Sequence, residues 1–133
     1  MSFIEDNSEK TIIMVDDNFD NKKLYKGLFE KSGFTFIFLE TSTTFIDHLE
    51  SPSFNQTSIV ILDYNIDAYY HGIELLKKIR EKKHVIPVII FSSSASEELN
   101  KYDLSNYLPA FNLDKVDFNG KKLLNFCKSL LLV

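Results

Sequence analysis

Acidic side chains follow two apolar segments of this sequence in an arrangement suited to metal-assisted phosphoryl transfer. Asp16 and Asp17 come directly after the apolar run 11–15, and Asp63 comes directly after the run 59–62. Three carboxylates that converge on one crevice repel one another unless a cation or a proton compensates their charge. Oxygen ligands without His or Cys suit a hard divalent cation, for which Mg²⁺ is the default inside cells. An Asp carboxylate can also attack phosphorus and form an aspartyl phosphate.

Two further side chains would complete such a site. Ser92 follows the apolar run 88–91, and Lys115 lies just beyond 107–113, where a fifth strand is expected. The Ser92 hydroxyl and the Lys115 ammonium would donate to phosphoryl oxygens, and a metal would neutralise their charge. Each residue alone has a simpler explanation, as a helix N-cap, a turn residue or a surface lysine. Their shared position at strand ends favours the site.

Strand-like and helix-like segments alternate along the whole chain. Short runs rich in β-branched residues predict strands buried on both faces, and apolar residues at helical spacing predict helices between them. The predicted strands are 11–15, 34–39, 59–62, 88–91 and one within 107–113. The predicted helices are 20–32 with Leu24, Tyr25, Leu28 and Phe29 on one face, 43–50, one with Ile73, Leu76 and Ile79 buried, a short one from Ser96 to about Tyr102, and one with Leu123, Phe126, Cys127 and Leu130 buried.

This alternation predicts an α/β fold, a doubly wound five-stranded parallel sheet with helices on both faces. The ligand crevice of such a fold lies beyond the carboxyl ends of the strands, where the polar residues above stand. Pro109 is compatible only with the start or the edge of a strand. We expect Arg80 and its neighbouring lysines to face outward. Residues 1–9 are predicted to be an N-terminal extension, and residues 10–133 one domain.

Composition excludes several classes of function. Of the 133 residues 44% are hydrophobic, which is too many for a disordered chain. Lys and Arg number 15 against 19 Asp and Glu, a net charge of -4 that argues against direct nucleic-acid contact. No apolar run approaches the roughly 20 residues of a membrane helix. The single cysteine, Cys127, excludes an internal disulfide and is expected in the core, so we predict a cytoplasmic domain.

From about Lys10 onward the sequence resembles the receiver domain of two-component response regulators. The segments that carry the resemblance are 13–18, 59–63 and 87–92. The resemblance implies a flavodoxin-like receiver fold. It also implies Mg²⁺-dependent phosphorylation of Asp63 by a sensor histidine kinase or a histidine phosphotransfer protein.

The same resemblance assigns roles to individual residues. Asp16, Asp17 and Asp63 would hold Mg²⁺ together with the backbone carbonyl of Asn65. Ser92 and Lys115 would correspond to the family's switch hydroxyl and invariant lysine.

The sequence departs from the family pattern after the fifth strand and after the acceptor. Receivers usually carry Lys-Pro at the end of strand five, whereas Lys115 is followed by Val116. A register that matches Phe111 to the family's rotating aromatic would put Asp114 at the lysine position. With Lys115 in that position, Asn112 takes the place of the aromatic.

The loop after the acceptor is also unusual. Asp67 stands where family members often have Pro, and residues 68–71 lengthen the loop. These departures keep open a pseudo-receiver, a binding module that acts without phosphate. A flavin protein is disfavoured because Asp16 and Asp17 would repel the flavin phosphate, and a metal-dependent phosphatase because Phe19 stands where its second acid is needed.

The predicted receiver includes the last helix, and no output domain is expected beyond it, which predicts a single-domain regulator rather than an enzyme. Such a protein would signal by docking to a downstream protein. A phosphorylation-dependent homodimer is among the expected outputs, and contact with nucleic acid or a membrane is not.

Overall fold

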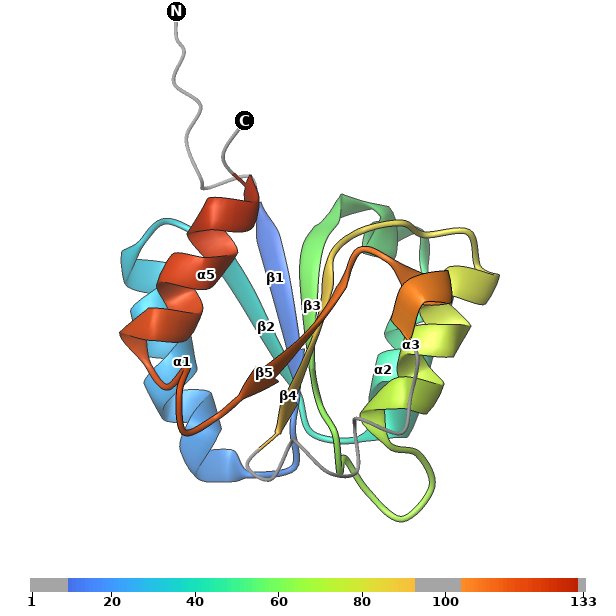
Figure 1. The fold of residues 1–133 in the computed structure, drawn as a ribbon, viewed down its shortest axis with the longest axis horizontal. Helices are drawn as coiled ribbons and strands as arrows, with labels where there is room; N and C mark the ends of the chain where they lie inside the picture. Colours follow the sequence, from blue (N-terminus) through green and yellow to red (C-terminus); the bar gives the residue numbers. More distant parts are fainter. Residues whose placement is uncertain (1–9, 93–103, 132–133) are drawn as a thin grey trace, which may run out of the picture.

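The computed structural model describes residues 10–92 and 104–131, and its centre is a parallel sheet of five strands in the order β2-β1-β3-β4-β5. Helices α1 and α5 cover one face of the sheet, and α2 and α3 cover the other (Figure 1). The predicted doubly wound α/β fold is therefore confirmed. The strands are β1 (Thr11–Val15), β2 (Thr35–Leu39), β3 (Thr57–Asp63), β4 (Val88–Ser92) and β5 (Ala110–Asp114). The helices are α1 (Phe19–Lys31), α2 (Ser42–Glu50), α3 (Gly72–Glu81) and α5 (Lys121–Leu131), with the short 3-10 turns η2 (Pro52–Gln56) and η3 (Leu104–Tyr107).

Alternating side chains of the central strands build two separate core layers. In β1, Ile13 and Val15 pack with the α2 and α3 side, whereas Ile12 and Met14 pack with the α1 and α5 side. All four are buried, because a strand with helices on both faces exposes neither side to water. The continuous apolar runs seen in the sequence are the direct result of this double burial.

Helix α1 lies where the sequence predicts it, but one of its predicted core residues is exposed. The Asn18 side chain caps its first turn by accepting a hydrogen bond from the Asp20 N–H at 2.9 Å. Tyr25 and Phe29 are buried as predicted, but Leu24 is 50% exposed, so its predicted place in the core is wrong. The buried stripe of this helix is narrow, because only the face centred on Tyr25 and Phe29 contacts the sheet.

At the β5 edge of the sheet, the structure differs from the sequence-based expectation at Arg80. Pro109 directly precedes this edge strand, where its missing N–H is tolerated as predicted. Arg80 does not face outward as expected, because its guanidinium donates to the carbonyl oxygens of Tyr107, His84 and Pro109 at 2.8, 2.8 and 2.9 Å. The chain that leads into β5 runs over the end of α3, and Arg80 ties the two together.

Three other predictions concern single residues or segments. Cys127 is buried in the α1 and α5 layer, and burial raises the pKa of its thiol to about 12, which confirms a core residue. The predicted short helix from Ser96 to about Tyr102 lies outside the described residues. In the part of the chain that the structure describes, every helix is too short or too polar to cross a membrane.

Candidate functional site

Three carboxylates meet at the carboxyl end of the sheet. Asp16 follows β1, and Asp63 ends the neighbouring strand β3, so the pairing of Val15 with Leu62 brings their side chains to one edge. One carboxylate oxygen from each of Asp16, Asp17 and Asp63 lies within 4.8 Å of the other two. Among residues 10–92 and 104–131, this is the one group of acidic, His and Cys side chains with metal-binding spacing.

A single lysine reaches this group from the far end of the chain. The ammonium Nζ of Lys115 lies 3.3 Å from Asp16 Oδ2 and 3.6 Å from Asp63 Oδ1. It also lies 5.6 Å from the centre of the Phe91 ring, a distance at which a cation is attracted to the ring face. The Asp114 carboxylate instead accepts a hydrogen bond from the Val116 N–H at 2.8 Å. Lys115, and not Asp114, is therefore the residue of this pair that faces the crevice.

Ser92 ends β4, the strand that lies between β3, which carries Asp63, and β5, which precedes Lys115. Strand β4 is hydrogen-bonded to β3 on one side and to β5 on the other, with Asp63 paired to Phe91. Ser92 is 2% exposed, and its carbonyl oxygen accepts a hydrogen bond from the Lys115 N–H at 2.9 Å. The backbone of Ser92 thus helps to bring Lys115 to the crevice.

Asp16 is held by two residues of the following turn. The Asn18 N–H donates to Asp16 Oδ1 at 2.9 Å, and the Asn21 side-chain amide donates to Asp16 Oδ2 at 2.8 Å. Asn21 was missed in the sequence because an amide on the first turn of a helix has many explanations. Its position five residues after Asp16 places it above the carboxylate once α1 forms.

The electrostatics of the crevice leave negative charge uncompensated. The pKa of Asp63 is raised from 3.8 to about 7, chiefly by burial and secondly by the nearby Asp16 carboxylate. The Lys115 ammonium and the Asn65 N–H lower the pKa, but only in part. A proton or a cation must supply the missing positive charge at neutral pH. The donor set, made of carboxylate oxygens, fits a hard divalent cation such as Mg²⁺.

The loop after Asp63 turns back so sharply that its last residue must be small. The Gly72 N–H donates to the Tyr64 carbonyl at 2.8 Å. A Cβ on Gly72 would lie 2.8 Å from the Asp63 carbonyl oxygen, which is closer than real Cβ contacts. Gly72 therefore lets α3 begin against the backbone of Asp63, a requirement that no local pattern in the sequence indicates.

Phe111 and Asn112, the two candidates for the aromatic position of strand five, have different surroundings. Phe111 packs against Phe126 of α5, with ring centres 5.3 Å apart. Asn112, three residues before Lys115, is exposed. With Lys115 facing the crevice, the position expected to carry a mobile aromatic therefore holds a polar side chain.

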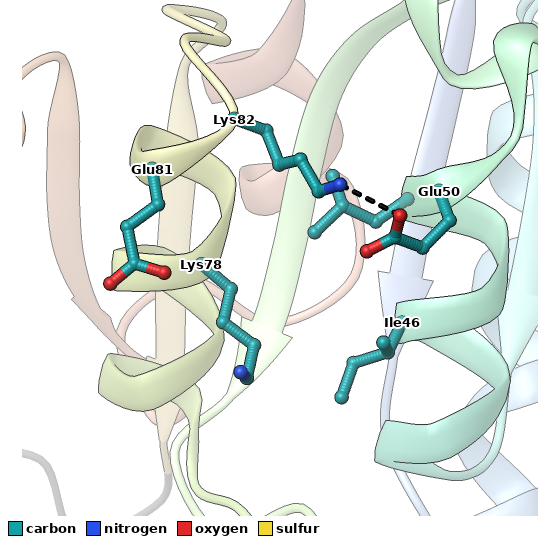
Figure 2. Close-up of a pocket in the computed structure, with 6 residues that line it drawn as sticks. Ile46, Glu50, Lys78, Glu81 and Lys82 are labelled. Carbon is teal, nitrogen blue, oxygen red and sulfur yellow. Dashed lines mark hydrogen bonds and ion pairs between the residues drawn. The ribbon is translucent and has the colours of Figure 1, made fainter.

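A hollow of about 320 Å³ lies between α2 and α3, lined by Ile46, Leu49, Glu50, Lys78, Glu81 and Lys82. Figure 2 shows Lys82 extending from α3 toward α2, where its ammonium lies 2.7 Å from a Glu50 carboxylate oxygen. Basic and acidic side chains are balanced around this hollow, so it offers no net charge to a ligand. It does not compete with the acidic crevice as a candidate site.

The fold and the crevice together define a class of protein: a doubly wound α/β domain with an acidic site beyond its strand ends. The family model described as "Response regulator receiver domain" matches residues 12–106. The chain belongs to this family. Receiver domains are phosphoryl-accepting signalling domains of two-component systems, which in general bind Mg²⁺ at an acidic pocket and interact with histidine kinases or phosphotransfer proteins.

Solved structures show the same fold at low sequence identity. A CheY-like receiver domain protein from Methanospirillum hungatei JF-1 is 19% identical, with a TM-score of 0.70 over 91% of this chain and 95% of that one. The chemotaxis protein CheY4 of Vibrio cholerae is 17% identical, with a TM-score of 0.72 over 92% and 98%. The response regulator TrrA of Thermotoga maritima, in complex with Mg(2+)-BeF, is 21% identical, with a TM-score of 0.72 over 92% and 99%. No curated protein sequence matches the chain.

Proposed function

We propose that the protein is a single-domain response regulator whose Asp63 accepts a phosphoryl group in a Mg²⁺-dependent reaction. The observation that carries this proposal is the meeting of the Asp16, Asp17 and Asp63 carboxylates within 4.8 Å, with the Lys115 ammonium 3.6 Å from Asp63. The donor would be a sensor histidine kinase or a histidine phosphotransfer protein. The complex of TrrA with Mg(2+)-BeF supports a Mg²⁺ site in a domain of this fold.

Each residue of the crevice has a task in this reaction. Asp16, Asp17, Asp63 and the Asn65 carbonyl would hold Mg²⁺, which when bound neutralises charge on the phosphoryl oxygens. An Asp63 oxygen forms the new bond to phosphorus while the N–P bond of the phosphohistidine breaks, and the imidazole nitrogen keeps the electron pair. Lys115 and Ser92 would donate to the phosphoryl oxygens.

We further propose the extent of the domain, its location in the cell and its kind of partner. Residues 10–133 form the receiver and residues 1–9 an extension, and the protein acts in the cytoplasm by docking to a downstream protein. A homodimer that forms on phosphorylation is one such output. The net charge of -4 supports a protein partner rather than nucleic acid.

The test is intact mass spectrometry after incubation with acetyl phosphate, with and without Mg²⁺. We expect one phosphoryl adduct on the wild type that requires Mg²⁺ and is absent from Asp63→Asn. Asp114→Asn is the matched control, because it removes a carboxylate one residue from Lys115 that does not face the crevice. A folded wild type without an adduct would contradict the proposal.

A second candidate, the pseudo-receiver, is favoured by the exposed Asn112 in place of a mobile aromatic. It predicts that the protein forms no Mg²⁺-dependent adduct and that Asp63→Asn leaves partner affinity unchanged. The mass measurement above separates the two candidates.

A further inference from the structure

One carboxylate, that of Asp67, joins the loop between β3 and α3 to helix α2. The Ser42 N–H donates to Asp67 Oδ2 at 2.7 Å, and the Ser42 hydroxyl donates to Asp67 Oδ1 at 3.0 Å. Ser42 is the first residue of α2 and is fully buried. The loop that follows Asp63 is thus tied to a rigid element 25 residues earlier in the chain.

The same carboxylate also organises the loop itself. The N–H groups of Tyr69 and Tyr70 donate to Asp67 Oδ1 at 3.0 and 3.1 Å, and the Asp67 N–H donates to the Tyr70 carbonyl at 3.3 Å. Hydrogen bonds to an ionised acceptor are stronger than those between neutral groups. Four donors on one carboxylate therefore give this loop one defined shape.

The defined shape includes the backbone of Asn65. Ile66, between Asn65 and Asp67, is fully buried in the core layer of α2 and α3. A bridge between the backbones of Asn65 and His71 closes the other side of the loop. With a buried side chain on one side and the Asp67 carboxylate two residues away, the Asn65 peptide has little freedom to move from the crevice.

We propose that Asp67 is a positioning residue for the cation, which holds the Asn65 carbonyl at the crevice by fastening the loop to Ser42. This inference rests on the function proposed above. Asp67 does not itself join the carboxylate group of the crevice, which consists of Asp16, Asp17 and Asp63. Residues that orient a ligand in this way commonly change metal affinity when they are replaced.

The test is the dissociation constant of Mg²⁺, measured by calorimetry on the full chain. Asp67→Ala is expected to weaken binding roughly tenfold. Asp67→Asn is expected to weaken it less, because one side-chain oxygen can still accept hydrogen bonds. Ser42→Ala retains the Asp67 charge and removes one donor, so a smaller but measurable weakening would show that the contact matters and not merely a distant charge.

Thr41→Ala is the control for general loosening of α2. The Thr41 hydroxyl accepts a hydrogen bond from the Thr44 N–H at 3.1 Å and caps the same helix without touching the loop. We expect this variant to lose stability and to bind Mg²⁺ as the wild type does.

The outcomes separate this inference from the function on which it rests. A wild type that binds no Mg²⁺ would overturn both. Wild-type binding with an unchanged dissociation constant in Asp67→Ala, or an equal loss in Thr41→Ala, would overturn the positioning role alone. If Asp67→Ala does not fold, Asp67→Asn and Ser42→Ala decide the question, and unchanged binding in both would overturn the role.

Discussion

Half-buried charged groups lie near both ends of helix α3, and their surroundings differ. Near its end, the Arg80 guanidinium meets three carbonyl oxygens, those of Tyr107, His84 and Pro109, at 2.8 to 2.9 Å. Near its start, Asp63 lies beside the Asp16 carboxylate, and its nearest cation is the Lys115 ammonium at 3.6 Å. The Arg80 guanidinium has three hydrogen-bond acceptors, whereas the negative charge of Asp63 is only partly compensated by Lys115.

The contrast separates a structural contact from a ligand-binding one. A half-buried cation such as Arg80, with an acceptor for each of its hydrogen bonds, stabilises the fold because the polar groups involved keep partners. Buried like charges with incomplete compensation destabilise it, and such sites are typical of functional pockets because a ligand supplies what is missing. The Arg80 contacts are complete without a ligand, whereas the fold is stabilised when a proton or a cation binds at the acidic end of the helix.

Removing Arg80 should produce the largest effect on stability. Arg80→Ala removes three hydrogen bonds from a charged donor, although the Pro109 carbonyl keeps the Val88 N–H as a donor. We expect a loss of about 3 kcal/mol in the free energy of unfolding. Urea denaturation of wild type and variant measures it. Lys77→Ala, an exposed position on the same helix, is the control and should change stability by less than about 0.5 kcal/mol. Equal losses in both variants would show that the Arg80 contacts add nothing.

Neutralising Asp63 should raise the free energy of unfolding, whereas removing Arg80 lowers it. Its pKa is raised from 3.8 to about 7 in the folded protein, so the folded state binds the proton more tightly than the unfolded state. The ionised form therefore lowers stability as the pH rises, with no effect below 3.8 and the full effect above 7. After allowance for solvent screening, we expect metal-free Asp63→Asn to be about 2 kcal/mol more stable than wild type at pH 8.

The pH dependence of that difference identifies its cause. Urea denaturation in the presence of a chelator should show the stability gap between Asp63→Asn and wild type shrinking below pH 7 and closing near pH 4. A gap that is constant with pH would mean that packing, rather than the charge of Asp63, separates the two proteins.

Mg²⁺ should compete with the proton for the acidic end. With a pKa of about 7, Asp63 is about 10% ionised at pH 6 and about 90% ionised at pH 8. Because Mg²⁺ binds the ionised form, its affinity should rise about tenfold between these pH values, or about 1.4 kcal/mol. Calorimetry at both pH values checks this, and equal affinities would place the cation away from Asp63.

The exposed ion pair beside the hollow should have the smallest effect. The Lys82 ammonium lies 2.7 Å from a Glu50 carboxylate oxygen, but the two side chains are 43% and 55% exposed. A dashed line marks this pair in Figure 2. Exposed pairs of this kind contribute about 0.5 kcal/mol. A double-mutant cycle with Lys82→Ala and Glu50→Ala measures the coupling. A value above about 2 kcal/mol would place this pair in the same class as the Arg80 contacts.

Local patterns in the sequence were sufficient for the strands, the long helices and the acidic ends of β1 and β3. A strand buried on both faces needs a continuous apolar run, and the polar residue that ends the run marks the edge of the sheet. Pro109 gave a further boundary because its backbone restriction is local. Since parallel strands end at one edge, the alternation of elements also predicted that Asp16 and Asp63 would meet.

Tertiary structure alone decided the contacts between distant segments. Asp67 binds Ser42 across 25 residues of sequence, and Arg80 binds the Pro109 carbonyl across 29. No local preference encodes such pairs, because they depend on how the strands are ordered and how far each loop reaches. The raised pKa of Asp63 belongs to the same group, since burial and the neighbouring Asp16 carboxylate exist only once the sheet has formed.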